Sequence, residues 1–352
     1  MSGTTLGKGC TGPTLGSVSV LLLTDARLVD HETGQHHPES PARLAAVIDA
    51  LAEASLDEAL VHVVPEPAPF ERIVAAHSAA MVNLVERRCS TGGHLDADTA
   101  VVPASWQAAQ LAAGAGLTAA ARLEAGEGDA AFCAVRPPGH HATREVSMGF
   151  CLLNNVAVTA MHLVERGERV AIVDFDAHHG NGTQDVFYAD ERVLFVSWHQ
   201  WPLYPGTGRV EETGAGSAAG STVNIPLPPG ATGDLYLRSL DELVVAKIER
   251  FAPTWLLLSA GFDSHRADPL GGLGLTTGDY VGILRRLLVL VPRGRAIAFL
   301  EGGYNLQALG ACSATLVATL AGERFPTEAP TSGGPGAAAV ERAIETHREW
   351  LA

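Results

Sequence analysis

Residues 169–182 read "RVAIVDFDAHHGNG", an apolar run followed directly by acids, histidines and glycines. Asp174, Asp176 and His178 alternate where the apolar run ends, and side chains two apart in an extended strand share one face. A short run that is apolar on both faces is typical of a strand buried in a parallel sheet. The stretch therefore predicts an α/β fold in which chemically active side chains follow the end of a central strand.

Short β-branched runs alternate with longer Ala- and Leu-rich segments of helical period along the rest of the chain. The predicted strands are 18–23, 131–135, 170–173, 193–196, 255–258 and 296–300. The predicted helices are 41–54, 105–124, 152–166, 234–250 and 277–289. This alternation is typical of a parallel sheet with helices on both faces, so we expect a single α/β domain with a mainly parallel central sheet.

The two ends of the chain differ from this core. Residues 1–17 lack the basic start and apolar stretch of a secretory signal, so we interpret them as a flexible leader. The segment "TEAPTSGGPGAAA", near residue 330, is typical of a linker, and an amphipathic pattern follows it at about 340–351. We therefore predict a main domain at 18–325, followed at 326–352 by a linker and a helix that packs on it.

The composition excludes several classes of function. The chain has 39 acidic and 24 basic residues, a formal net charge of −15, which repels phosphate backbones and favours cationic ligands. No apolar run reaches the roughly 18 residues that a membrane span requires. The five cysteines are scattered without a CxxC spacing, which indicates neither a disulfide framework nor a cysteine zinc site. We expect a cytoplasmic protein that binds neither nucleic acid nor membrane, and the sequence leaves a homo-oligomer open.

Polar segments follow five of the predicted strands. In chain order they are "RPPGHHA", "DFDAHHGNG", "SWHQWPLYPG", "SAGFDSHRADPLGG" and "EGGYN". Loops at the carboxyl ends of parallel strands converge on one crevice, which is where ligands bind in open α/β sheets. We therefore expect the five segments to form one site.

Asp176, His178 and Asp263 are the candidate metal ligands. Asp176 and His178 share a face of one strand end, and Asp263 is the best-placed carboxylate on another loop. One neutral imidazole and two carboxylates suit a catalytic zinc ion that keeps a position open for water and substrate. Each residue alone also fits a structural role as a cap or hydrogen-bond partner, but the joint pattern favours one zinc ion per chain.

Two adjacent histidines and a tyrosine supply further chemistry. His140 and His141 follow a Pro-Pro entry, and imidazoles that titrate near neutral pH suit general acid and base roles beside a metal. Asp174 and Asn181 are the nearest groups in sequence that can orient these rings. Tyr304 follows two glycines and can donate a hydrogen bond to a carbonyl oxygen or to the oxyanion it becomes. Loop histidines and buried tyrosines are also common without such roles, so the assignment depends on the whole set.

The segments together resemble the histone deacetylase family, in particular its branch of class II-like bacterial deacetylase-like and acetylpolyamine amidohydrolases. The resemblance spans about residues 18–320 and rests on seven segments, in order "HHPESPARL", "RPPGHHA", "GFCLLNNVA", "VDFDAHHGNGTQDVF", "YPGTG", "SAGFDSHRADPLGG" and "EGGY". It implies an arginase-like α/β fold with one zinc ion at the base of a narrow tunnel, and it makes residues 18–325 a zinc-dependent deacetylase domain.

The resemblance also implies roles for individual residues. The zinc ligands would be Asp176, His178 and Asp263. The catalytic residues would be His140 as acceptor of the water proton, His141 as proton donor to the leaving amine, Tyr304 as the carbonyl-polarising group, and Asp174 and Asn181 as partners of the histidines. The substrate-binding residues would be Gly149, Phe150, Tyr204, Leu270 and Asp98, and Arg43 would line an internal exit channel. A structural potassium ion would lie against Asp174, Asp176, His178, Ser197 and Trp198.

The activity that this resemblance implies is zinc-dependent removal of acetyl or other short acyl groups from amines. Acetyl-lysine side chains are favoured over acetylpolyamines, because Leu270 stands where polyamine-selective relatives carry an acid at the tunnel mouth. Tyr304 is retained, so activity is expected. Asn181 stands where class I members have Asp, and a neutral partner should raise the pKa of His141 less.

Two other functions stay open at this point. A catalytically silent relative would bind acylated ligands without turnover, although every catalytic residue type is retained. A two-metal ureohydrolase on the same fold would need further carboxylates to bridge two ions, and the neutral "TQ" that follows "DFDAHHGNG" does not supply them. Turnover of an acetyl-lysine amide would separate these functions.

Overall fold

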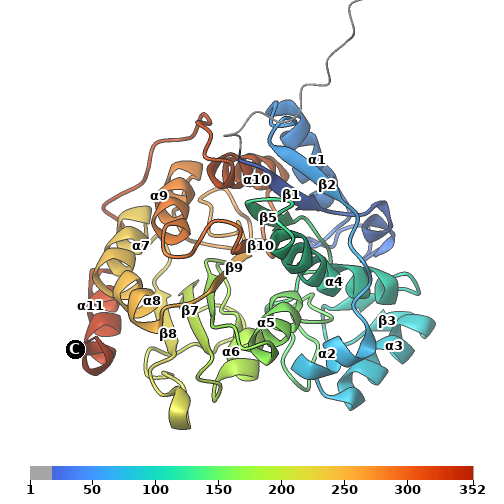
Figure 1. Cartoon of the computed structure of the whole chain (residues 1–352), viewed down its shortest axis with the longest axis horizontal. Helices are drawn as coiled ribbons and strands as arrows, with labels where there is room; N and C mark the ends of the chain where they lie inside the picture. The colour runs from blue at the N-terminus through green and yellow to red at the C-terminus, as the bar shows by residue number, and fades with distance from the viewer. Residues whose placement is uncertain (1–17, 352) are drawn as a thin grey trace, which may run out of the picture.

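The computed structural model describes residues 18–351, and its centre is a sheet of eight parallel strands (Figure 1). From edge to edge the strands are β2 (Leu60–Val63), β1 (Val20–Leu23), β5 (Ala130–Cys133), β10 (Ala296–Leu300), β9 (Trp255–Ala260), β6 (Val170–Asp174), β7 (Val193–Gln200) and β8 (Thr222–Leu227). Two short strands, β3 (Gly93–His94) and β4 (Ala100–Val101), pair antiparallel outside this sheet. The prediction of a single α/β domain with a mainly parallel central sheet is confirmed.

The register of the central strands fixes where the polar segments meet. Asp174 at the end of β6 is the register partner of Ser197 on β7 and of Ser259 on β9. The strands β6, β7, β9 and β10 are buried along their whole length, which agrees with their continuous apolar sequences. Because these strands are parallel, the segments that follow them leave the sheet side by side at one edge.

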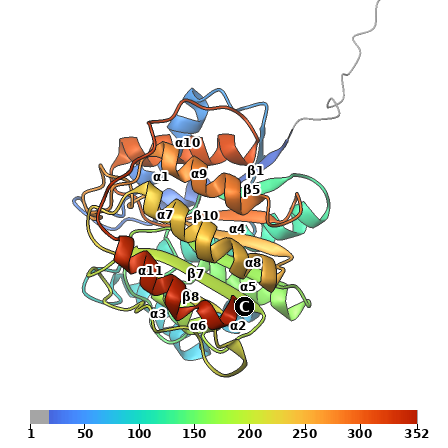
Figure 2. The ribbon, with the colours of Figure 1, turned by 90° about the vertical axis from the view of Figure 1, so that its left-hand side faces the viewer.

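Helices cover both faces of the sheet (Figures 1 and 2). One face carries α1 (Ala42–Glu53), α7 (Gly233–Ser239), α8 (Val245–Phe251), α9 (Thr277–Leu288), α10 (Leu306–Leu320) and α11 (Ala337–Thr346). The other face carries α4 (Ser105–Glu124) and α5 (Asn155–Glu165), with α2 (Phe70–Ala76), α3 (Ala79–Thr91) and α6 (Asn181–Phe187) packed beside them. The helices of each group contact one another, α1 with α10 and α4 with α5.

The composition of α4 permits its close approach to the sheet. Its sequence, "SWQAAQLAAGAGLTAAARLE", is rich in alanine and glycine, and most of it is buried. A Cβ at Gly116 would lie 2.6 Å from a ring carbon of Phe299 on β10 and 2.0 Å from the Thr159 hydroxyl oxygen. A larger side chain at this position would push the helix away from the sheet, so glycine sets the layer spacing here.

All six predicted strands are present, and the helix predicted at 105–124 coincides with α4. The helix predicted at 234–250 is interrupted by a π-helical turn at Leu240–Val244. The sequence did not predict α2, α3, α6, α10, β2 or β8. Pro226 lies within β8, an edge strand where its missing N–H is tolerated, and β2 is an edge strand that is only partly buried.

The segment predicted as a linker is held against the domain. His265 Nε2 lies 2.8 Å from a carboxylate oxygen of Glu328, and the Thr331 hydroxyl lies 2.8 Å from Asp279 Oδ2. The following α11 packs on β8 and α7. The predicted leader, residues 1–17, lies outside the described residues. Within 18–351 no helix is both long and apolar enough to cross a membrane.

Candidate active site

Asp176, His178 and Asp263 lie together at the carboxyl edge of the sheet. One ligand atom from each of the three side chains lies within 4.8 Å of the others, and His178 Nδ1 is 3.1 Å from Asp176 Oδ1 and 2.9 Å from Asp263 Oδ2. Backbone groups orient both carboxylates, because Gly302 N–H donates to Asp176 at 2.8 Å and Ala177 N–H donates to Asp263 at 2.7 Å. The three side chains therefore converge from the ends of β6 and β9, as the sequence predicted.

The electrostatics of this cluster favour a cation. Burial raises the pKa of Asp263 to about 7, and the neighbouring Asp176 carboxylate adds to this effect. Burial disfavours the charged ring of His178, but its hydrogen bonds to Asp176 and Asp263 outweigh burial and raise its pKa to about 10. Buried carboxylates that repel one another are stabilised by a positive ion. One imidazole nitrogen and two carboxylate oxygens form a donor set that fits zinc.

The tandem histidines lie beside this cluster with their ring centroids 4.0 Å apart. The Nδ1 atom of His140 is 2.9 Å from Asp174 Oδ2, and the Nδ1 atom of His141 is 2.8 Å from Asn181 Oδ1. Both oxygens accept from an Nδ1 proton, which leaves the Nε2 atom of each ring as the basic nitrogen. Asp174 and Asn181 are the two groups that the sequence analysis named as candidate partners of these rings.

The protein's own groups assign opposite protonation preferences to the two rings. Burial disfavours the charged form of His140, but the carboxylates of Asp176 and Asp174 outweigh it and raise the pKa of His140 well above its ordinary value. Burial and the charges of His140 and His178 lower the pKa of His141 well below its ordinary value. The carboxylates therefore favour the charged form of His140, and burial favours the neutral form of His141.

A cavity of about 390 Å³ leads to this cluster. It is lined by His37, Pro38, Asp98, His141, Gly149, Phe150, His178, Tyr204, Leu270 and Tyr304. The structure thus brings together all five residues that the sequence assigned to substrate binding. Tyr304 meets Phe150 edge to face with ring centroids 6.0 Å apart, and Tyr204 meets His141 in the same way at 5.2 Å. The aromatic walls make a passage suited to an extended, mostly apolar chain.

Gly149 and Phe150 form a strained turn in this wall. Their φ angles are 58° and 69°, in the left-handed region that favours glycine. A Cβ at Gly149 would lie 2.6 Å from a ring atom of His141, so a side chain there would collide with the site. Phe150 has a side chain despite this conformation, and its N–H donates to the Thr99 hydroxyl at 3.0 Å. Such a conformation costs about 1–3 kcal/mol, and here it places an aromatic ring in the tunnel wall.

The mouth of the cavity carries both acidic and apolar side chains. Burial, and next to it the Asp96 carboxylate, raise the pKa of Asp98. Asp96 shapes the loop, because it accepts from the N–H groups of Asp98 at 3.1 Å and Thr99 at 2.7 Å. Leu270 is 38% exposed, and its N–H donates to Asp268 at 2.9 Å. The rim therefore offers an acid on one loop and an apolar surface on another.

Arg43 lies behind Tyr304 in a buried ionic network. Its guanidinium donates to Gly303 O at 2.7 Å and lies 5.1 Å from the centre of the Tyr304 ring. The buried carboxylate of Glu39 contacts Arg43 at 3.2 Å and Arg136 at 2.6 Å, and these charges lower its pKa to about 2 against the effect of burial. Sequence reasoning named Arg43 but missed Glu39 and Arg136. Both lie in quoted motifs. Arg136 directly follows the apolar run 130–135, and a charge in that place is a signal of a buried ionic partner, whereas the polar segment around Glu39 gives no such signal.

The residues assigned to potassium lie on adjoining strand ends. Asp174 on β6 is the register partner of Ser197 on β7. The Ser197 hydroxyl is 3.0 Å from His199 Nδ1, and the buried Trp198 indole donates to Ser239 Oγ at 2.7 Å. These side-chain contacts neither test nor exclude an ion held by backbone carbonyls, so the potassium site stays a prediction.

Comparison with known proteins agrees with this fold and geometry. The profile of the histone deacetylase domain matches residues 37–320. The chain is 42% identical over 299 residues to a probable deacetylase of Archaeoglobus fulgidus, with 83% of each chain covered. It is 38% identical to the chloroplastic histone deacetylase 10 of Oryza sativa subsp. japonica, covering 82% of this chain and 70% of the relative. The crystal structure of the HDA15 HD domain superposes with a TM-score of 0.87 at 33% identity, covering 95% of this chain and 97% of the other.

The fold and the profile together define a hydrolase of the deacetylase type. The chain belongs to the histone deacetylase family. Membership and these relatives support deacetylase activity, which is the hydrolysis of an amide of an acylated amine.

Proposed function

We propose that the protein is a zinc-dependent deacetylase that removes acetyl or other short acyl groups, most readily from lysine side chains. The observation that carries this proposal is the metal-ligand cluster Asp176, His178 and Asp263 at the base of an aromatic-walled cavity. Its position beside the tandem histidines provides both a metal site and proton-transfer groups around one point. Zinc bound to these three residues would polarise the amide carbonyl and make an attacking water more acidic.

The remaining steps fall to the chain's own groups. His141 lines the cavity and favours the neutral form, so we propose that its Nε2 accepts the proton of the attacking water. His140, whose charged form the carboxylates of Asp176 and Asp174 favour, then stabilises the negative charge that develops on the carbonyl oxygen, together with the Tyr304 hydroxyl. His141 returns its proton to the leaving amine. This order differs from the sequence expectation, which gave the first proton transfer to His140. The reason is that the carboxylates of Asp176 and Asp174 raise the pKa of His140, whereas burial and the neighbouring imidazoles lower the pKa of His141.

The shape of the cavity favours a long, thin side chain. Phe150 and Tyr204 flank the passage, and an extended lysine stem can lie between such rings while its acyl group reaches the metal ligands. The acid at the mouth, Asp98, could accept from a backbone amide of a peptide or hold an ammonium group of a polyamine. The exposed Leu270 provides no second anion for a polyamine, which favours acetyl-lysine.

We further propose that a structural potassium ion lies against Asp174, Asp176, His178, Ser197 and Trp198. An exit channel for the product would run beside Arg43. The protein would act in the cytoplasm, on acylated proteins or small amines. The main domain would span residues 18–325. Assembly into a homo-oligomer stays an open question.

Turnover of a fluorogenic acetyl-lysine amide tests this proposal, with acetylspermidine and a longer acyl-lysine amide as competing substrates. We expect hydrolysis that a hydroxamate inhibits strongly, because such a group offers two oxygens to the metal. Absence of turnover by the zinc-loaded protein on every acyl amine, combined with tight binding of acetyl-lysine, would instead indicate a silent binding protein.

A further inference from the structure

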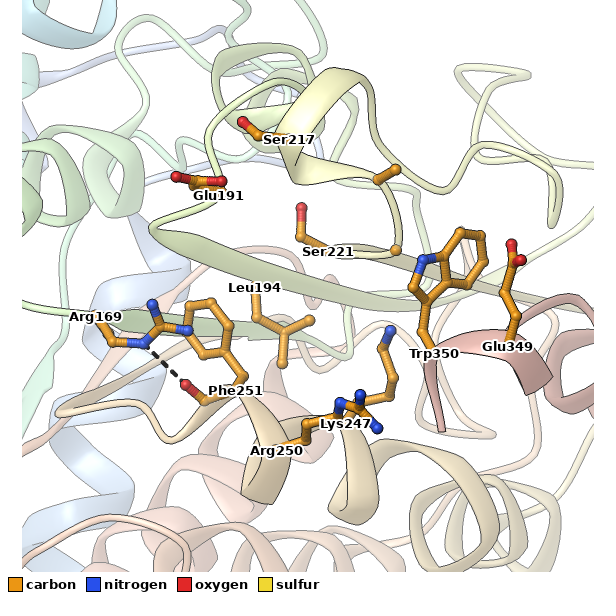
Figure 3. Close-up of a pocket in the computed structure, with 12 residues that line it drawn as sticks. Arg169, Glu191, Leu194, Ser217, Ser221, Lys247, Arg250, Phe251, Glu349 and Trp350 are labelled. Atoms are coloured by element: carbon orange, nitrogen blue, oxygen red, sulfur yellow. Dashed lines mark hydrogen bonds between the residues drawn. The ribbon is translucent and has the colours of Figure 1, made fainter. Parts of the chain in front are cut away.

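A second hollow, of about 500 Å³, is drawn in Figure 3. It lies at the opposite edge of the sheet from the candidate active site. It borders the amino ends of β6, β7 and β8, because Arg169 and Ser221 immediately precede β6 and β8 and Glu191 lies two residues before β7. The helix α8 and the 3₁₀ turn Arg348–Trp350 close its other sides. None of its lining residues belongs to the site described above.

Lys247 on α8 is the central feature of this hollow. Its side chain is largely covered, with 7% of the residue exposed, and Figure 3 shows its ammonium group pointing into the space between Leu194 and Trp350. The ammonium lies 5.4 Å from the centre of the Trp350 ring. Among residues 18–351 no carboxylate forms an ion pair with it, although Glu191 and Glu349 also line the hollow.

The position of Lys247 is electrostatically unfavourable in the protein alone. Burial, followed by the positive charge of Arg250, lowers the pKa of Lys247 to about 8. The amine is therefore still mostly charged at neutral pH, in a place where water solvates it poorly. A covered charge without a counter-ion destabilises the fold, and a bound anion would offset that cost.

The other lining groups indicate which anion fits. Arg169 and Arg250 add positive charge. Ser217 and Ser221 line the opposite side, where the Ser221 hydroxyl donates to Ala218 O at 2.7 Å (Figure 3). The three cations Lys247, Arg169 and Arg250 suit a phosphate group, which carries about two negative charges and three acceptor oxygens at neutral pH. The rings of Phe251 and Trp350 provide apolar walls for the organic part of a ligand. The net charge of −15 elsewhere opposes long polyanions and so restricts the site to small molecules.

We propose that this hollow, which we call the Lys247 pocket, binds a small phosphorylated molecule through Lys247 with its phosphate between α8 and the Ser217–Ser221 turn. The proposal is independent of the deacetylase chemistry at the other edge of the sheet.

Lysine-selective NMR of the full chain tests this proposal sharply, because the sequence contains only Lys8 and Lys247. The probes are inorganic phosphate and phenyl phosphate, added to protein labelled with ¹³C at lysine. A bound dianion favours the charged amine, so both probes should raise the titration midpoint of the Lys247 signal by about one pH unit, and the Lys8 signal should not move. Saturating phenyl phosphate that leaves the Lys247 midpoint unchanged would overturn the proposal.

Affinity for phenyl phosphate, measured by calorimetry, gives a second readout. Lys247→Met keeps the apolar stem and should weaken binding at least about tenfold, because a charge-assisted hydrogen bond is lost. The matched control is Arg87→Met, which removes one exposed cation on α3 and should change the affinity by less than about twofold. Thermal melting shows that each variant is folded before it is titrated. Equal losses in the two variants would mean that only the general charge of the surface is sensed, which contradicts a built pocket.

Discussion

Tyr304 lies between the tunnel wall and the buried guanidinium of Arg43. The backbone N–H of Tyr304 donates to Asp268 Oδ2 at 2.6 Å. Burial raises the pKa of its phenol well above the ordinary value, so the hydroxyl stays protonated and can donate. We expect Tyr304→Phe to keep the fold and metal content while kcat falls roughly 10²–10³-fold, the usual cost of losing one oxyanion donor. Steady-state kinetics on an acetyl-lysine amide checks this, and a variant that retains half of the wild-type kcat would contradict the role.

Leu270 is the residue whose replacement should change substrate preference. We expect Leu270→Glu to raise kcat/KM for acetylspermidine, relative to an acetyl-lysine peptide, by roughly two- to fivefold, because an exposed ion pair contributes about 0.2–1 kcal/mol. Leu270→Gln is the matched control, since the glutamine side chain has the same shape as that of glutamate but carries no charge. The same shift in both variants would show that the charge at the rim is not what selects the substrate.

At single residues, sequence reasoning succeeds where chemistry and adjacency coincide. Asp176 and His178 could be paired from their two-residue spacing, and their grouping with Asp263 is seen in the structure. Glu39 could not be found in this way, because its partner Arg136 lies 97 residues away and the contact depends on the packed fold.

Glu301, directly after β10, forms hydrogen bonds to the loop that carries the tandem histidines. Glu301 Oε2 accepts from Gly139 N–H at 2.7 Å and from His140 N–H at 3.1 Å. We expect Glu301→Ala to lower kcat roughly 10²-fold with little change in KM, because small displacements of catalytic groups cost that much. Glu301→Gln retains an acceptor oxygen and should recover most of the rate. If both variants raise KM without affecting kcat, Glu301 does not position the histidines.

His347, which follows α11, should make the stability of the fold sensitive to acid. Neither ring nitrogen has a hydrogen-bond partner among the described residues, and burial lowers the pKa of His347 to about 3. A histidine whose pKa is depressed in the fold contributes full stability above its unfolded pKa of about 6.5 and destabilises the fold as pH falls below that value. We expect His347→Leu to stabilise the protein against urea by about 2 kcal/mol more at pH 5 than at pH 7.5.

The exposed His62 on β2 provides the control for this experiment, and His62→Leu should show no such pH-dependent gain. An identical difference in the two variants would mean that burial of His347 is not the cause.

Among the elements, the strands that are buried on both faces were predictable, because a short and continuously apolar run is typical of a strand in a parallel sheet. Edge strands such as β2 and β8 carry mixed patterns, and α10 has an almost uniformly buried surface without helical periodicity. The short helices α2 and α6, of seven residues each, depend on tertiary contacts rather than on local pattern. Packing decides these elements, and the local sequence contains little information about it.

On the scale of the whole molecule, one feature joins the fold to the proposed activity. A parallel sheet places the ends of β5, β6, β9 and β10 at one edge, and the acids and histidines that follow them meet there. The molecule's negative charge favours cations generally, so charge by itself does not separate lysine substrates from polyamines. The metal-ligand cluster is the feature on which the proposed chemistry depends.

The most direct test measures zinc by elemental analysis in the purified wild type and in Asp263→Asn, alongside turnover of an acetyl-lysine amide. Asparagine preserves the shape of the side chain, and circular dichroism establishes that the variant is folded. We predict about one zinc ion per wild-type chain with active turnover, and loss of both in the variant. Full zinc content in folded Asp263→Asn, or undiminished wild-type turnover after complete removal of zinc, would contradict a zinc-dependent deacetylase built on these three ligands.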